Sequence, residues 1–237
     1  MNLDFSDDQK FLQDEARKFF DKEGGLTNTR KVMDESLSHD EALWGKVLEL
    51  GWTGIRIPEE YDGLGLGHLE LCVIAEEIGR ALAPIPFSSS VYLFTETIIK
   101  YGSEEIKKNV LPKLVTGEIV GTYAVAEDMS AITESTLSCA VEGDSVTGAK
   151  IAVPDAELAT HAVVLVKGTK GPELRLVDLN SDGVEISLQK NLDKSRSFYK
   201  VAFNNAQSSL LGDQGSGWES HVHIMDQAAV LFAFEQV

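Results

Sequence analysis

The sequence predicts an α+β multidomain protein. It has an all-α N-terminal helical domain (1–118), a small antiparallel β-barrel or sandwich as middle domain (119–217), and the first helix of a truncated C-terminal helical bundle (218–237). Three observations predict this order. Apolar residues recur at helical spacing through the first half, short β-rich runs alternate with turn residues after Gly117, and helical spacing returns at Trp218. The last helix carries no stop signal, so we expect the bundle to be truncated.

The helical domain is marked by capping residues. Ser6 is expected to cap a helix that runs to about Phe20. Ser38 and Glu41 have the spacing of a capping box ahead of the next helix. Pro112 should kink or divide a later helix, because proline lacks the N–H that a helix interior uses. Further helices are expected over 68–83, over 88–101 and from Ser103 onward.

The middle domain is predicted from its turn signals. Gly143 and Asp144 are expected to form a hairpin turn. Seven short strands in so short a segment favour a small barrel or a sandwich. The expected strands are Ile119–Ala126, Thr136–Val141, Ser145–Val153, His161–Val166, Leu174–Leu179, Val184–Leu188 and Phe198–Phe203.

Charge and composition exclude several classes of partner. Lys and Arg total 21 against 38 Asp and Glu, a formal net charge of −17, so we expect no nucleic acid and no anionic membrane surface as partner. No apolar run reaches the roughly 18 residues of a membrane span, and the acidic N-terminus is unlike a signal peptide. Cys72 and Cys139 have neither CxxC nor metal-binding spacing. We therefore expect a cytoplasmic protein with two reduced thiols and no metal site.

Three stretches carry a resemblance to a known family. Residues 57–65 read IPEEYDGLG and resemble the PEEYGGLG loop of acyl-CoA dehydrogenases. Residues 101–127 resemble that family's run from YGSEEQK to TE, and residues 211–218, LGDQGSGW, are similar to its LG..G.GW join to the C-terminal domain. The order and spacing of the three stretches together identify the chain as a member of the acyl-CoA dehydrogenase family.

This resemblance implies an activity. Members of the family bind FAD and acyl-CoA between the β domain and the C-terminal helices, and they pass electrons to an electron-transfer flavoprotein. We therefore expect an oxidoreductase, an FAD-dependent flavoprotein that dehydrogenates an acyl-CoA thioester in fatty acid or steroid side-chain metabolism, working as a homo- or hetero-oligomer of acyl-CoA dehydrogenase subunits. The family's base, a glutamate, comes from the C-terminal domain. The resemblance thus implies no catalytic residue in this chain and no activity of the fragment alone.

The resemblance also implies a cofactor site. By match to the family's flavin strand and to the strand after it, the cofactor-binding residues are Tyr123, Val125, Ala126, Ala152 and Pro154. Three of them depart from the family pattern. A Thr is replaced by Ala126, which removes a hydroxyl, a Trp is replaced by Ala152, which removes aromatic surface, and a Thr is replaced by Pro154, which has no N–H.

The segment after the flavin strand lacks the family's AGSD glycine loop. The substrate-binding residues are predicted here, at Ala131 and Ile132, although their side chains hinder the close approach that glycine permits. Three hypotheses follow from these departures. The protein is an FAD-dependent acyl-CoA dehydrogenase, or a non-catalytic, flavin-poor structural subunit of a heteromeric one, or a CoA-thioester binding module. Residues 79–86 are similar to family members from steroid and other bulky-substrate pathways, where heteromers occur.

The remaining ionisable residues are predicted to have structural roles. Glu127 is expected to hydrogen-bond locally at a strand end, and Arg196 to form an ion pair. Lys150 is expected to be a solvated strand lysine, although it could support a ligand phosphate. His221 and His223 lie two residues apart in a helix, so they face different directions and do not form a metal pair.

Overall fold

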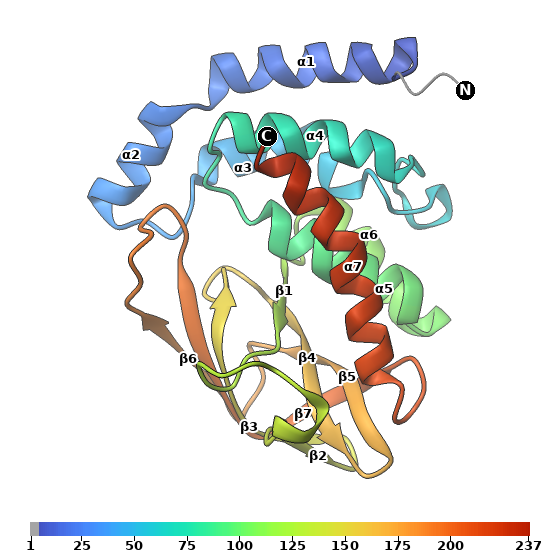
Figure 1. Cartoon of the computed structure of the whole chain (residues 1–237). Helices are drawn as coiled ribbons and strands as arrows, with labels where there is room; N and C mark the ends of the chain where they lie inside the picture. Colours follow the sequence, from blue (N-terminus) through green and yellow to red (C-terminus); the bar gives the residue numbers. More distant parts are fainter. Residues whose placement is uncertain (1–4) are drawn as a thin grey trace.

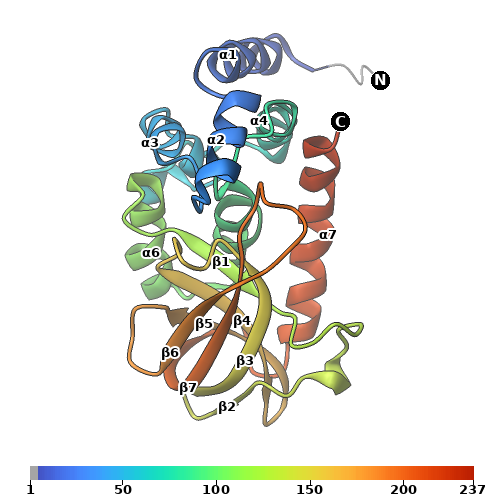
Figure 2. The ribbon, with the colours of Figure 1, turned by 90° about the vertical axis from the view of Figure 1, so that its left-hand side faces the viewer.

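The computed structural model describes residues 5–237 and places a layer of helices over a β-barrel, with the last helix running alongside both (Figure 1). A view from the side shows that helix standing at the edge of the molecule, beside both layers (Figure 2). The predicted fold class is confirmed. No helix in residues 5–237 combines the length and hydropathy needed to cross a bilayer.

Within residues 5–237 the helical layer is built from six α-helices, one π-helix and two short 3-10 turns, a third 3-10 turn lies in the barrel segment, and a further α-helix follows the barrel. In chain order they are α1 (Asp7–Glu23), α2 (Leu26–Glu35), α3 (Glu41–Glu49), η1 (Trp52–Gly54), η2 (Glu59–Tyr61), α4 (His68–Arg80), η3 (Ser88–Thr95), α5 (Glu96–Tyr101), α6 (Glu104–Thr116), η4 (Glu134–Thr136) and α7 (Gly217–Glu235).

One predicted cap is confirmed and one is wrong, and of the kink or division predicted at Pro112 the division is wrong. Ser6 caps α1, since its Oγ accepts from the backbone N–H of Gln9 at 3.2 Å. Ser38 does not cap α3, because a carboxylate oxygen of Asp40 accepts the N–H of Leu43 at 3.0 Å instead. Pro112 lies inside α6 without dividing it. Buried leucines on both sides of the proline hold that helix in the core, which offsets the lost hydrogen bond.

In residues 5–237 the β layer has seven strands, each overlapping a predicted one, but most of the strand predicted over Thr136–Val141 is not strand and the last strand runs past its predicted end at Phe203. The strands are β1 (Gly121–Ala124), β2 (Ala140–Glu142), β3 (Ser145–Pro154), β4 (His161–Gly168), β5 (Gly171–Asp178), β6 (Val184–Gln189) and β7 (Phe198–Leu211).

Strand pairing closes the sheet into a barrel. The order β4-β2-β3-β7-β5 returns to β4 through the β4–β5 pairing, while β1 joins the edge of β4 and β6 pairs with β7. Most pairs are antiparallel, as predicted, and Gly143 and Asp144 form the expected β2–β3 hairpin turn. The difference lies at β4, which pairs in parallel with β1 and briefly with β2. Closure leaves few unpaired strand edges.

The π-helix η3 links the two layers, and all eight of its residues are buried. It forms the first part of the helix predicted over 88–101. The Oγ of Ser90 accepts the backbone N–H of Gly121 at 3.2 Å, at the start of β1. A Cβ on Gly121 would lie 2.0 Å from the ring of Phe94, so this position needs glycine. The helical layer is therefore pressed directly onto the first strand.

Candidate functional site

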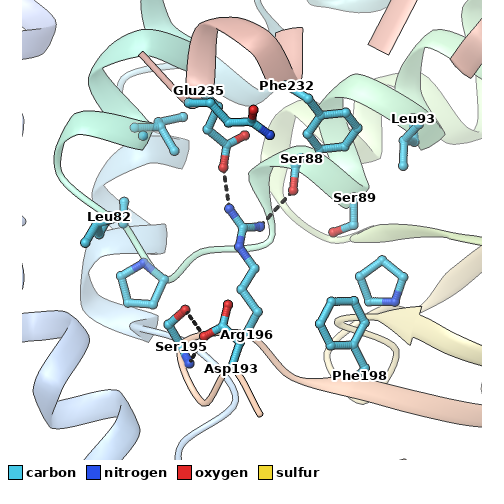
Figure 3. Close-up of a pocket in the computed structure, with 16 residues that line it drawn as sticks. Leu82, Ser88, Ser89, Leu93, Asp193, Ser195, Arg196, Phe198, Phe232 and Glu235 are labelled. Carbon is cyan, nitrogen blue, oxygen red and sulfur yellow. Dashed lines mark hydrogen bonds and ion pairs between the residues drawn. The ribbon is translucent and has the colours of Figure 1, made fainter. Parts of the chain in front are cut away.

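A cavity of about 510 Å³ lies between the β-barrel and the helices. Its helical walls come from the end of α4, residues 82–84, η3 and the last turn of α7 (Figure 3). The rest of the wall comes from Pro154 and the β6–β7 loop. Cavities of roughly 300–1,000 Å³ are the usual size for small-molecule sites. This cavity is therefore the candidate binding site.

Most of the cavity wall is apolar. Ile78 from α4, Leu93 from η3, Phe198 from β7 and Phe232 from α7 all line it, together with Leu82. Leu82 is 56% exposed and has a positive φ of 48°, which is uncommon for a residue other than glycine. A wall of this kind favours an apolar ligand, because burying apolar surface is the main source of binding energy.

One charged side chain crosses the cavity. Arg196 comes from the β6–β7 loop and points its guanidinium between Ser88 and Glu235 (Figure 3). Its Nη1 donates to Ser88 Oγ at 2.8 Å, and its Nη2 forms an ion pair with the Glu235 carboxylate. The ion pair predicted for Arg196 is confirmed. Burial raises the pKa of Glu235, and the charge of Arg196 opposes that shift.

A second carboxylate is buried behind the cavity wall. Asp155 is 6% exposed, and one of its oxygens accepts the hydroxyl of Ser89, which lines the cavity, at 2.6 Å. Burial raises the pKa of Asp155, while this hydrogen bond and the charge of Arg196 lower it. The bond ties η3 to the turn after β3.

Gly79 sets the distance between α4 and the end of α7. A Cβ at this position would lie 1.7 Å from the backbone oxygen of Glu235. Only glycine allows the two helix ends to approach so closely. This contact fixes the helix turn that carries Glu235.

Three of the predicted flavin residues lie in different environments: the cavity wall, the core under α7 and an exposed bulge. Pro154 lines the cavity, and its carbonyl accepts the Thr122 hydroxyl at 2.6 Å. Tyr123 is buried under α7 with 4% exposure. Ala152 is exposed at a bulge in β3, with a φ of 50°, and its N–H donates to Gln189 Oε1 at 2.7 Å.

The other predicted residues lie apart from the cavity. Ala126 is half-buried, and its carbonyl accepts the N–H of Ile151 at 2.8 Å. Val125, Ala131 and Ile132 meet around a second hollow of about 10 Å³. A hollow of this volume has room for about one water molecule, so it is too small for a substrate group. The structure does not join the predicted substrate residues to the cavity.

Lys150 is buried, so the prediction of a solvated lysine is wrong. Its side chain is fully buried, and its Nζ donates to Glu127 at 2.7 Å and to the carbonyl of Val125 at 3.0 Å. Glu127 also accepts the backbone N–H groups of Ser138 and Cys139 at 2.7 and 3.0 Å, which confirms its predicted local role. Burial lowers the pKa of Lys150, and Glu127 opposes the shift. The pair anchors the segment between β1 and β2.

Three of the five predicted flavin positions lack a group that the resemblance implies for holding a flavin ring. Ala126 has no hydroxyl, and Pro154 has no N–H to donate. The N–H of Ala152 is already bonded to Gln189. The donors that the resemblance implies at positions 126 and 154 are therefore absent, and so is the aromatic surface that it implies at position 152.

Comparison with known proteins shows similarity to acyl-CoA dehydrogenases in sequence and in fold. Residues 6–118 match the family described as acyl-CoA dehydrogenase, N-terminal domain. Mitochondrial isovaleryl-CoA dehydrogenase of Solanum tuberosum is 29% identical over 235 residues, which cover 91% of this chain and 56% of that protein. A variant of the Tcur3481-Tcur3483 steroid ACAD is 27% identical, with a TM-score of 0.83 over 97% of this chain and 62% of that one. Acyl-CoA dehydrogenase complexed with FAD from Bacillus anthracis has a TM-score of 0.87 over 98% of this chain and 43% of that one; at 24% identity this likeness shows the fold alone.

The fold and the cavity define a protein class in which a helical domain is joined to a small β-barrel with a ligand-sized cavity between them. The chain belongs to the acyl-CoA dehydrogenase family. It spans about half the length of the curated relatives it matches.

Proposed function

We propose that the protein is an acyl-CoA dehydrogenase, which removes the α- and β-hydrogens of an acyl-CoA thioester with FAD as cofactor and an electron-transfer flavoprotein as acceptor. One observation carries the proposal. The 510 Å³ cavity lies between the barrel and the helices, and Pro154, at a position that the resemblance assigns to flavin contact, forms part of its wall. Its apolar lining suits the acyl group of such a thioester.

In this proposal, the residues of the chain bind the acyl group and exclude water from it. The apolar wall would hold the acyl group, and desolvation there strengthens any polar contact to the thioester. The carboxylates that line or adjoin the cavity are engaged in structural contacts: Glu235 with Arg196, Asp155 with Ser89, and Asp193 with Ser195. We assign the catalytic base to none of them.

A second candidate is favoured by a specific observation. Ala126 and Pro154 lack the flavin donors that the resemblance implies, Ala152 lacks the implied aromatic surface, and the Ala152 amide is bonded within the chain. In this alternative the protein is a flavin-poor structural subunit of a heteromeric acyl-CoA dehydrogenase, and a sister subunit holds the flavin.

Flavin content separates the two candidates. The protein is purified as its full-length gene product, alone and co-expressed with a sister acyl-CoA dehydrogenase subunit, and its visible spectrum and acyl-CoA turnover are measured. A yellow, active preparation of the protein alone supports the first candidate. A colourless protein whose complex is yellow and active supports the second. A colourless, inactive complex would contradict both.

The position Ala126 offers a matched test. Ala126→Thr restores a hydroxyl at the position where the resemblance implies a flavin contact. If the chain faces a flavin, this variant should raise flavin retention several-fold, while Ala140→Thr on β2 should leave retention unchanged. Equal retention in both variants would count against a flavin at this face.

A further inference from the structure

We propose that Arg196 binds a carbonyl oxygen at the far end of a bulky acyl group held in the cavity. The proposal rests on the proposed function and adds the class of acyl group to it. That class is an apolar body of fused-ring size that carries a neutral oxygen remote from its thioester.

The size of the cavity favours a bulky body. Its volume of about 510 Å³ lies within the range of sites that enclose drug-sized ligands. The walls from Ile78, Leu93 and Phe232 present apolar surface over the helical side, and Phe198 does so from the barrel. A short straight acyl chain would leave much of this wall against water, which gives up binding energy.

The guanidinium has donors left for a ligand. A guanidinium carries five N–H groups and accepts no hydrogen bond. The bonds to Ser88 and Glu235 use two of them. The Arg196 side chain is 25% exposed and lines the cavity, so further N–H groups can reach an acceptor there (Figure 3). A carbonyl oxygen is an acceptor only, and it therefore complements this group.

The local charge favours a neutral oxygen over a carboxylate. Glu235, 13% exposed, already neutralises Arg196. Asp155 lies behind the wall near enough to act electrostatically on both, and His39, whose pKa is lowered by burial, faces Asp155 without adding a fixed positive charge. A ligand carboxylate would therefore enter a site with no surplus positive charge and would lose its hydration.

The ligand class is tested by direct binding to the 237-residue chain, without turnover. Three probes share one fused-ring skeleton: the ketone, the hydrocarbon that lacks the oxygen, and the carboxylic acid. Calorimetry should show the ketone binding about ten- to hundredfold more tightly than the hydrocarbon, the range expected for a hydrogen bond to a charged group. The acid should bind more weakly than the ketone. Equal binding of ketone and hydrocarbon, a preference for the acid, or no binding to the folded chain would overturn the proposal.

Two variants locate the effect. Glu235→Gln keeps Arg196 but removes the negative charge paired with it, so binding of the acid should strengthen at least about tenfold, while the ketone preference remains. The double variant Arg196→Leu/Glu235→Leu removes the ion pair as a unit, which avoids a lone buried charge, and should abolish the ketone preference. Persistence of that preference in the double variant, with its circular dichroism unchanged, would refute the role of Arg196.

The experiments distinguish a failure of this binding proposal from a failure of the proposed function. A ketone preference in a protein whose full-length product and complexes turn over no acyl-CoA would uphold the binding site and refute the dehydrogenase. Turnover without any ketone preference would refute the binding site alone.

Discussion

The hydroxyl of Tyr123 lies 3.2 Å from Nδ1 of His221, and the two rings stack with centroids 5.9 Å apart and planes at 18°. The pair joins β1 to α7, and both side chains are buried. Burial lowers the pKa of His221 to about 4, and the nearby charge of Lys150 adds to this shift. The contact between barrel and helix therefore depends on a neutral histidine.

Protonation of His221 should lower the stability of the folded protein as the pH falls. The unfolded chain binds a proton at His221 below about pH 6.5, whereas the folded chain resists protonation until about pH 4. The stability that neutral His221 supports is thus complete above pH 6.5 and is lost as the pH falls from 6.5 toward 4, by at most about 3 kcal/mol.

Thermal unfolding of the wild type and of His221→Phe between pH 7.5 and 4.5 measures this effect. The variant is less stable at pH 7.5, because Tyr123 loses its partner, and its melting temperature should depend less on pH. Parallel pH profiles for both proteins would rule out His221 as the titrating group.

Removing Lys150 should destabilise the barrel strongly. Lys150→Met leaves the largely buried Glu127 without its cation, and breaking one side of a buried ion pair costs about 3–5 kcal/mol. The double variant Lys150→Met/Glu127→Gln removes both charges and should recover part of that loss. Urea unfolding provides the free energies. A loss of less than about 0.5 kcal/mol in the free energy of unfolding of the single variant would show that the ion pair contributes little to stability.

Gly79 and Gly45 form a matched pair of helix glycines. Gly79→Ala places a Cβ 1.7 Å from the Glu235 backbone oxygen, and we expect a loss of about 1–3 kcal/mol and a displaced end of α7. Gly45→Ala in α3 meets nothing within 4 Å and should stabilise the protein by about 0.5–1 kcal/mol. Chemical unfolding tests both. Similar effects of the two substitutions would mean that α7 does not rest on α4 in solution.

The 237-residue chain alone should show no acyl-CoA dehydrogenation, because the carboxylates that line or adjoin its cavity are engaged in ion pairs and hydrogen bonds. Reduction of an artificial electron acceptor by acyl-CoA, with added FAD, measures this. Turnover above the rate without protein would show that one of these carboxylates, or another group of the chain, acts as base.

The sequence was sufficient to predict elements with a regular period. The strands over 145–153 and 184–188 lie within one residue of their observed ends, because alternation and turn residues are local signals. The parallel pairing of β1 with β4 joins residues about forty positions apart, for example Gly121 and His161, and no local pattern encodes it. The α2 helix was not predicted, since its N-terminal Gly25 provides no side-chain cap.

The site was harder to predict for the same reason. A lysine between apolar neighbours gives no sign that its partner, Glu127, lies 23 residues earlier. The cavity collects side chains such as Leu82, Ser88 and Phe232 from separate segments, and each has a core or surface role by its own pattern. Only Pro154 was both predicted for the cofactor site and found in the cavity. A resemblance locates motifs, whereas a cavity is a property of packing.

The attachment of η3 to the barrel limits how a ligand can enter. Ser89 and Ser90 bond to Asp155 and to Gly121, and Phe94 rests on the first residue of β1. A hinge that swung the two layers apart would break all of these contacts together. Access is therefore expected by displacement of the β6–β7 loop, so the rate of ligand uptake should respond to changes in that loop while the layers move as a single body.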